Sequence, residues 1–370
     1  MSTERSAIQK SLSRLAAGRD LSRDEAFAAM STIMDGDAAG AQIGAFLMGL
    51  RAKGETPDEI TGCAEAIRDR ALPVPHSDPS LLDTCGTGGD GASTFNISTT
   101  AAFIAAGAGQ KVAKHGNRAI SSRTGSADVL EELGVTIDMA GPEVAGALDE
   151  VGITFLFAPT FHAAMRHAGP PRKQMGMRTV FNVLGPLCNP AGATAQIVGV
   201  YDPDMTGVLA RVLGNLGVER AVVVHGCDGL DEITITGPTR AAEWTGSEVV
   251  EYEIEPESFG LPRGSMESLA GGGPALNARI LRGVLEGTDG GPRAIALLNA
   301  GAALMVAGRA EDIKEGVRLA RESVDSGAAL ASLEDLLAYS RTLREREGGR
   351  RAAPDRVSGG IPGWGQVDGR

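Results

Sequence analysis

The segment from Asp83 to Thr99 reads DTCGTGGDGASTFNIST, in which an apolar strand end passes through closely spaced glycines into a helix start. Glycines allow backbone N–H groups to approach a ligand, and a helix N-terminus adds positive potential. The pattern therefore favours an anion-binding loop with Thr94, Asn96 and Ser98 as polar contacts. A glycine-rich turn with Asn96 or Ser98 as a helix N-cap is the simpler alternative. Neither the P-loop pattern nor the dinucleotide-binding fingerprint is matched.

A second polar segment runs from Lys114 to Ser126 and follows the next predicted strand. It carries the cations Lys114, Arg118 and Arg123 beside serine hydroxyls, in a chain that is acidic overall. Such a group can neutralise a diphosphate, although charged loop residues are often only solvated. Because the carboxyl ends of parallel strands meet at one edge of a sheet, we expect this segment to lie beside the glycine-rich turn.

An acidic turn, HGCDGLDE, follows a third apolar run. Its carboxylates Asp228, Asp231 and Glu232 are close together in the sequence. Hard oxygen ligands of this kind suit a magnesium ion that also binds substrate phosphates. A lone acidic turn is more often a solvated loop, so the magnesium interpretation depends on its pairing with the anion-binding loop.

A fourth segment contains RKQMGMRTVFNVLGPL and includes Arg172 and Arg178. Either guanidinium could bind a substrate carboxylate through two parallel hydrogen bonds. The nearby His162 and His167 lack a metal-ligand spacing, and histidines in such positions are commonly structural hydrogen bonders.

The composition is that of an ordinary globular protein. The chain has 370 residues, 42% of them hydrophobic and 22% charged, which is enough to bury a full core. Its formal net charge of −12 and its aromatic content of 4% argue against a nucleic-acid partner, which needs a basic face. The longest apolar stretch, Ala294 to Gly308, is interrupted by Asn299 and is too short to span a membrane. We expect a buried helix there and no membrane association.

The four cysteines are far apart and form no CxxC pair. This spacing predicts neither a disulfide framework nor a zinc site, and it fits a reducing cytoplasm. The polar N-terminus lacks the apolar region of a secretory signal.

The elements that must position these segments follow from hydrophobic periodicity. The first part of the chain predicts helices over 7–17, 22–34, 38–53 and 56–71. Capping-box spacings support two of these helix starts, at Ser22 with Glu25 and at Thr56 with Glu59.

From Leu81 onward, short apolar runs alternate with helical segments. The predicted strands are 81–84, 111–113, 154–157, 197–201 and 221–225, and the helices between them are 97–106, 127–133 and 205–216. Polar–apolar alternation predicts added strands over 231–236 and 248–254. Residues 277–347 are again helical in pattern. This rhythm predicts an α/β fold with a central, mostly parallel sheet.

Taken together, GTGGD, NIST, KHGNR followed by SS, RTVFNVLGPL and HGCDGLDE resemble, in this order and spacing, the anthranilate phosphoribosyltransferase family. The resemblance covers residues 5–345. It implies transfer of the phosphoribosyl group from 5-phosphoribosyl 1-diphosphate to the amine of anthranilate, in tryptophan biosynthesis, with Mg²⁺ as cofactor.

The resemblance also implies the domain organisation. A small all-helical domain would comprise residues 1–73 and 163–190, and a larger α/β domain of nucleoside phosphorylase-like fold would comprise 74–162 and 191–345. The family pattern is a homodimer with the active site between the domains. Residues 346–370 are rich in glycine and arginine, and we predict a flexible tail there.

The site residues that the resemblance implies fall into three groups. The contacts to phosphoribosyl diphosphate would be Gly86, Gly89, Asp90, Thr94, Asn96, Ser98, Thr99, Lys114, Asn117, Arg118, Ser121, Ser122 and Ser126. The magnesium ligands would be Ser98, Asp231 and Glu232. The contacts to anthranilate would be Gly86, His115, Asn117, His162 and Arg172. The chain departs from the family pattern at Phe161, where a second histidine is common, and at Arg123-Thr124, which replaces a frequent Lys-Ser.

The implied reaction needs no protein nucleophile, because the acceptor amine is already nucleophilic and catalysis rests on orientation and electrostatics. A pyrimidine or thymidine phosphorylase of similar architecture is the nearest rival, but it needs no diphosphate-bound metal, so Asp231, Glu232 and the NIST helix start weigh against it. A non-catalytic nucleic-acid-binding relative is disfavoured by the charge of −12.

Overall fold

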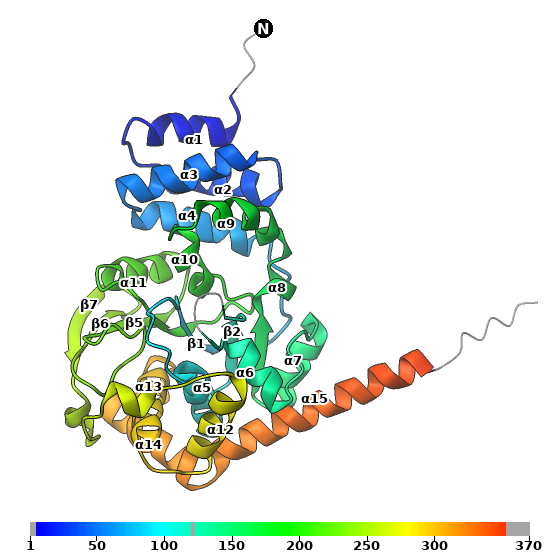
Figure 1. Ribbon diagram of the computed structural model, residues 1–370, viewed down its shortest axis with the longest axis vertical. Coiled ribbons are helices and arrows are strands. Elements are labelled where there is room, and N and C mark those ends of the chain that lie inside the picture. Colours follow the sequence, from blue (N-terminus) through cyan, green and yellow to red (C-terminus); the bar gives the residue numbers. More distant parts are fainter. Residues whose placement is uncertain (1–4, 120–122, 353–370) are drawn as a thin grey trace, which may run out of the picture.

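The computed structural model describes residues 5–119 and 123–352, which form a helical domain and an α/β domain (Figure 1). The helical domain begins with α1 (Ala7–Leu15), α2 (Arg23–Met34), α3 (Gly40–Lys53) and α4 (Pro57–Arg68). Both predicted capping boxes are confirmed, since the hydroxyls of Ser22 and Thr56 accept hydrogen bonds from the backbone N–H groups of Glu25 and Glu59.

A later part of the chain returns to the helical domain. After α8 (Ala158–Phe161) come η1 (Ala163–His167), α9 (Gly169–Met175), α10 (Phe181–Leu184) and η2 (Gly185–Leu187). Helix α9 packs against α3, and η1 packs against α2, while α10 lies between the two domains in Figure 1. The assignment of residues 163–190 to the helical domain stays a prediction.

The α/β domain contains one seven-stranded sheet with the strand order β3-β2-β1-β4-β5-β6-β7. The strands are β1 (Leu82–Gly86), β2 (Val112–Gly116), β3 (Ile153–Phe157), β4 (Ala195–Gly199), β5 (Arg220–Gly226), β6 (Thr239–Trp244) and β7 (Val249–Ile254). The first five are parallel, and β6 and β7 are antiparallel. The predicted mostly parallel sheet is confirmed.

One predicted strand was wrong. Residues 231–236 form a loop rather than a strand, and β6 begins only at Thr239, after Gly237 and Pro238. The loop bonds to side chains instead of a neighbouring strand, because the N–H of Ile233 donates to Asn299 and the N–H of Thr234 donates to Thr239. Polar and apolar side chains therefore alternate here although the backbone does not pair with a neighbouring strand.

Helices cover both faces of the sheet. One face packs against α5 (Ile97–Gly107), α6 (Ser126–Leu133), α12 (Pro274–Leu285), α13 (Gly291–Val306), α14 (Ile313–Asp325) and α15 (Ala328–Ala352). The other face packs against α11 (Met205–Asn215), which also contacts α4 of the helical domain. Helix α7 (Gly141–Glu150) covers the end of the sheet at β3, and the short η3 (Pro256–Phe259) and η4 (Met266–Leu269) precede α12.

Helix α13 is the predicted buried helix, and every residue from Ala294 to Val306 is buried. Within the described residues, no helix combines the length and the apolar character needed to cross a membrane. All four cysteines are free thiols, as the spacing predicted.

The predicted tail begins later than expected. Helix α15 continues to Ala352, so residues 346–352 are helical rather than part of a flexible tail. Alanine, leucine, glutamate and arginine favour the helix strongly enough that Gly348 and Gly349, at about 1 kcal/mol each, do not end it. The remainder of the predicted tail lies outside the described residues.

Candidate functional site

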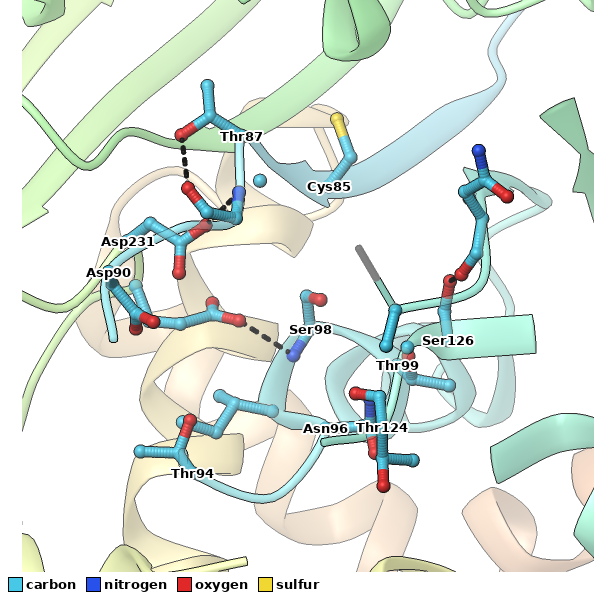
Figure 2. Close-up of a pocket in the computed structure, with 18 of the residues that line it drawn as sticks. Cys85, Thr87, Asp90, Thr94, Asn96, Ser98, Thr99, Thr124, Ser126 and Asp231 are labelled. Atoms are coloured by element: carbon cyan, nitrogen blue, oxygen red, sulfur yellow. Dashed lines mark hydrogen bonds between the residues drawn. The ribbon is translucent and has the colours of Figure 1, made fainter. Parts of the chain in front are cut away.

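A pocket of about 290 Å³ lies at the carboxyl ends of the central strands, where the strand order changes direction. The glycine-rich turn after β1, the basic segment after β2 and the acidic turn after β5 all contribute to its wall. Figure 2 shows Asp231 and Asp90 on one side, Asn96, Thr124 and Ser126 on the other, and Ser98 between them. Segments that are far apart in the sequence therefore converge as predicted.

Most residues predicted to contact phosphoribosyl diphosphate line this pocket. They are Gly86, Gly89, Asp90, Thr94, Asn96, Ser98, Thr99, Lys114, Asn117, Arg118 and Ser126. Asp231 and Glu232, predicted as metal ligands with Ser98, line it too. Ser121 and Ser122 lie outside the described residues. The structure thus brings these side chains together, while their contacts with substrate stay predictions.

The glycine-rich turn has a backbone that few other residues could adopt. Gly88 and Gly89 have φ values of +64° and +80°, in the left-handed region that side chains disfavour. The N–H of Gly88 donates to Oδ2 of Asp231 at 2.7 Å. Ser93 is a non-glycine residue at φ +53°, and its carbonyl accepts a hydrogen bond from Gly271 at 2.9 Å. The surrounding contacts hold this strained residue in place.

The acidic turn rests directly on the ends of two paired strands. Gly86 of β1 and Gly199 of β4 are partners in the sheet, and a Cβ at Gly86 would lie 2.4 Å from Oδ2 of Asp231. At Gly199 a Cβ would lie 1.5 Å from the carbonyl oxygen of Asp231. Next in the turn, Oε1 of Glu232 accepts a hydrogen bond from the N–H of Ser98 at 3.0 Å. The acidic pair is therefore fixed against both the sheet and the start of α5.

Burial raises the pKa of both acidic side chains. The pKa of Asp231 is raised to about 7, first by desolvation and then by the nearby charge of Asp90. The pKa of Glu232 is raised to about 8, first by desolvation and then by Asp231. Close carboxylates in a low-dielectric site resist ionisation together, so this pocket favours a cation beside them.

A buried lysine lies beneath the pocket. Lys114 is 4% exposed, and its Nζ donates to the carbonyl of Thr84 and lies 3.4 Å from Oγ of Ser98. Burial lowers its pKa, and the carboxylates of Asp83 and Glu232 oppose that shift. Asp83 also accepts a hydrogen bond from the N–H of His115 at 3.0 Å. Strand β2 thus places a positive charge next to the start of α5.

The chemistry of the donor set fits a hard cation that shares its ligands with a substrate. Two carboxylates, Asp231 and Glu232, and the hydroxyl of Ser98 are gathered here. No group of three or more His, Cys, Asp or Glu side chains in the described part of the chain is arranged to hold a metal ion. Magnesium commonly completes its coordination with waters and phosphate oxygens.

The third acidic residue of the turn has another task. Asp228 accepts hydrogen bonds from the hydroxyls of Thr234 and Thr236 and from the N–H of Leu230, and it does not line the pocket. It shapes the loop rather than facing a ligand, so its interpretation as a magnesium oxygen was wrong.

The basic segment is held by acidic side chains of α6. Arg118 forms ion pairs with Asp128 at 3.1 Å and with Glu131 at 2.8 Å. Asp128 also accepts hydrogen bonds from the N–H groups of Ala119 and Gly125. The guanidinium of Arg118 borders the pocket while bound to these carboxylates, so its predicted contact with a diphosphate would require exchange of partners.

A second cavity, of about 640 Å³, adjoins the first on the side of the helical domain. Arg172 lines it, lies 4.8 Å from the ring centre of Phe181, and has no ion-pair partner within 5–119 and 123–352. Burial lowers its pKa. Arg178, by contrast, donates to the carbonyl of Gly89 and stacks on Tyr201. Of the two arginines considered for a carboxylate, Arg172 is the one whose guanidinium makes no hydrogen bond or ion pair within the described part of the chain. The two cavities share Gly89, Asp90, Ser93 and Asn182.

The two predicted histidines form a buried pair. The rings of His115 and His162 are 5.1 Å apart. Burial lowers the pKa of His115 to about 3 and that of His162 to about 4, so both are neutral at pH 7. His115 lines the first pocket, and its Nε2 has no hydrogen-bond partner among the residues described. His162 lies behind it, and Phe161 is a core residue that lines neither cavity.

Several pocket residues were not predicted. Thr87, Ser93 and Asn182 lie within or beside recognised motifs, so proximity in sequence was a usable signal for them. Gly272 reaches the pocket from the segment before α12, where its carbonyl accepts a hydrogen bond from Thr124 at 2.7 Å. No motif marked Gly272 in advance.

Comparisons with known proteins agree with this geometry. Residues 9–71 match the family model described as the glycosyl transferase family, helical bundle domain, and residues 78–330 match the a/b domain of the same family. Anthranilate phosphoribosyltransferase of Moorella thermoacetica is 55% identical over 332 residues, which covers 90% of this chain and 98% of that protein. The enzyme of the same name from Symbiobacterium thermophilum is 54% identical over 333 residues, covering 90% and 98%.

Solved structures are similar over the same length. Anthranilate phosphoribosyltransferase from Thermus thermophilus has a TM-score of 0.86 and 44% identity, covering 91% of this chain and 100% of that one. The enzyme from Saccharomyces cerevisiae, in complex with PRPP and Mg, has a TM-score of 0.83 and 30% identity, covering 90% and 98%.

Proposed function

The chain belongs to the anthranilate phosphoribosyltransferase family, and we therefore propose that it transfers the phosphoribosyl group of 5-phosphoribosyl 1-diphosphate to the amine of anthranilate. The products are N-(5-phosphoribosyl)anthranilate and diphosphate, and the reaction belongs to tryptophan biosynthesis. The observation that carries the proposal is the convergence of the glycine-rich turn, Lys114 and the Asp231–Glu232 pair on one pocket.

The donor would lie in the first pocket. Ser98, Asp231 and Glu232 would hold magnesium, which when bound supplies positive charge against the departing diphosphate. The turn at Gly88 and Gly89 and the N-terminus of α5 present positive backbone potential. These groups are fixed before substrate arrives, so they can stabilise developing charge without reorganising.

The acceptor would lie where the two cavities meet. Arg172 is suited to the anthranilate carboxylate, since it is a partly buried cation without an ion-pair partner among the described residues. Neutral His115 can exchange a hydrogen bond with a polar group of the acceptor. No protein nucleophile is required, because the amine attacks C1 of the ribose directly and the chain's role is to orient the two reactants.

Replacing Arg172 with alanine is expected to raise the Michaelis constant for anthranilate by about tenfold to a hundredfold, since a hydrogen bond to a charged group contributes about 1.5–3 kcal/mol. Turnover at saturating anthranilate should fall much less. The exposed neighbour Lys173 lines the same cavity, and Lys173→Ala is the matched control with a smaller effect. Steady-state kinetics separate the two constants. An unchanged Michaelis constant with reduced turnover would exclude Arg172 as the carboxylate partner.

The proposed reaction can be tested by mixing the protein with phosphoribosyl diphosphate, magnesium and anthranilate and following the loss of anthranilate fluorescence. Loss that requires both magnesium and phosphoribosyl diphosphate is expected. Parallel assays with thymidine or uridine and inorganic phosphate test the phosphorylase alternative. Phosphorolysis without transfer to anthranilate would overturn the proposal.

The same family membership leads us to propose a homodimer located in the cytoplasm, with residues 1–73 and 163–190 as its helical domain. The four free thiols are consistent with a reducing compartment. Light scattering of the purified protein would test the dimer, which a monomeric mass would contradict.

A further inference from the structure

The acidic turn that bears Asp231 and Glu232 has no backbone ladder to hold it. It lies between β5 and β6 and forms a loop, yet its two carboxylates line the pocket beside Asp90. A metal site needs its ligands fixed to within a fraction of an ångström, and hydrogen bonds to neighbouring groups commonly supply that precision. Some part of the fold must therefore restrain this loop.

Asn299 supplies such a restraint from the middle of α13. Its side chain is 2% exposed, and Oδ1 accepts from the N–H of Ile233 at 3.0 Å while Nδ2 donates to the carbonyl of Ile233 at 2.8 Å. Nδ2 also donates to the carbonyl of Ile295 at 2.9 Å. The amide thus binds both polar groups of the residue that follows Glu232, as a neighbouring strand would.

The position of this asparagine is unfavourable unless it has a specific role. Helix α13 is apolar and buried on all sides from Ala294 to Val306, and a polar side chain in such a place is destabilising unless its hydrogen bonds are made. Asn299 makes them, and two of the three go to the acidic turn. A leucine of similar size would pack in the helix but would leave Ile233 without partners.

We propose that Asn299 is a positioning residue for the magnesium ligands, which it holds in register through the backbone of Ile233. The proposal rests on the proposed function, because it assumes that Asp231 and Glu232 bind the metal. It assigns the buried amide a role in metal affinity that extends beyond the stability of α13.

A second buried asparagine offers a chemically matched comparison. Asn277 of α12 accepts a hydrogen bond from the N–H of Gly272 at 2.7 Å and donates from Nδ2 to Oδ1 of Asn96 at 2.9 Å. It supports the opposite wall of the pocket and, within the described residues, makes no hydrogen bond to the acidic turn. The same substitution at the two positions therefore disturbs different halves of the site.

The experiment compares Asn299→Asp, Asn299→Leu, Asn277→Asp and Leu298→Ala with the unaltered protein. Leu298 is fully buried in α13, so its truncation destabilises the helix while leaving the contacts to Ile233 in place. Calorimetry measures the binding of phosphoribosyl diphosphate over a series of magnesium concentrations, and thermal unfolding measures stability. Binding is recorded without acceptor, so the result is independent of turnover.

The magnesium concentration that gives half-maximal binding should rise by about tenfold to a hundredfold for both Asn299 variants. Asn277→Asp should weaken the binding of phosphoribosyl diphosphate at saturating magnesium without changing that midpoint. Leu298→Ala should lower the unfolding temperature and leave the binding unchanged. The proposal would be overturned if neither Asn299→Leu nor Asn299→Asp, which retains an acceptor for the N–H of Ile233, changed this magnesium midpoint. An equal shift in Leu298→Ala would also overturn it, because general destabilisation would then suffice.

The unaltered protein distinguishes failure of this inference from failure of the proposed function. If its binding of phosphoribosyl diphosphate does not depend on magnesium, the proposed function is contradicted at the metal, whatever the variants do. If that dependence is present and Asn299 does not affect it, only the role of Asn299 is wrong.

Discussion

Asp231→Asn is expected to reduce the rate of phosphoribosyl transfer by about a hundredfold to a thousandfold, the range found when one electrostatic group of a preorganised site is removed. The same substitution is expected to stabilise the metal-free protein above pH 7. Asparagine has the same shape and can still accept the hydrogen bond that Gly88 donates at 2.7 Å. The substitution therefore removes the charge and leaves the turn largely intact. Lower activity together with higher stability is the result expected when a carboxylate contributes to function at the expense of stability.

The pH dependence follows from the raised pKa of Asp231. In the unfolded chain an aspartate has a pKa of about 3.9, whereas in the folded protein desolvation raises it to about 7. Well below pH 4 the carboxyl is protonated in both states and does not affect their balance. As the pH rises above 4, the unfolded state ionises first, so the folded state loses stability until the folded carboxyl also ionises near pH 7. The destabilisation is complete above that pH.

Thermal unfolding at pH 5, 6, 7 and 8 without magnesium measures this effect. The unfolding temperature of Asp231→Asn should exceed that of the unaltered protein by a margin that grows with pH. Glu232→Gln should behave similarly, with its margin still growing up to about pH 8. Adding magnesium and phosphoribosyl diphosphate should stabilise the unaltered protein more than either variant, since ligands stabilise only the state that binds them.

The exposed side chain of Glu248 provides the control. It lies in the turn before β7, away from the pocket, and Glu248→Gln should leave the activity unchanged. If Asp231→Asn lowered the unfolding temperature at pH 8 as much as at pH 5, the carboxylate would be a stabilising group. Its interpretation as a metal ligand whose buried charge destabilises the metal-free protein would then be wrong.

The sequence predicted the elements of the α/β domain because buried parallel strands are short apolar runs bounded by turns. The strand 221–225 lies wholly within β5 (Arg220–Gly226), and the helix 97–106 lies within α5 (Ile97–Gly107). The prediction failed over 231–236, where the partners of the backbone are side chains. Asn299 is more than sixty positions away from Ile233, so no local pattern could reveal that contact.

The candidate site was predictable in location and less so in detail. Glycines and charges after successive strands converge because of the fold, so the pocket could be anticipated from Gly86, Lys114 and Asp231. The partners of individual cations could not. Arg118 is bound by carboxylates of α6, and Arg178 is bound to the carbonyl of Gly89. The sequence indicates which kinds of group a charged side chain can bind, but its actual partner depends on the packing of the folded chain.

Gly199→Ala is expected to eliminate most of the transfer activity without touching a group that contacts substrate. The added Cβ would lie 1.5 Å from the carbonyl oxygen of Asp231 and 2.3 Å from its carbonyl carbon, far inside van der Waals contact. Backbone atoms cannot rotate away as a flexible side chain can, so either β4 or the acidic turn must move.

The acidic turn is the part expected to yield. Strand β4 pairs along its whole length with β1 on one side and with β5 on the other, whereas the turn is held only by individual hydrogen bonds. Displacement of Asp231 by 1 Å or more would disrupt the donor set, and a misplacement of about that size can reduce a rate by about a hundredfold. The overpacking itself should destabilise the fold by about 1–3 kcal/mol.

The kinetics and unfolding of Gly199→Ala should be compared with those of Gly44→Ala in α3. A Cβ at Gly44 meets no atom within 4 Å, and alanine in a helix is more stable than glycine by about 0.5–1 kcal/mol. Gly44→Ala should therefore retain activity and unfold at a slightly higher temperature. Normal kcat/KM in Gly199→Ala would mean that the turn can shift without affecting the reaction. In that case the added methyl group would have displaced the backbone of Asp231 without reducing the activity. Asp231 could then not be a precisely positioned metal ligand.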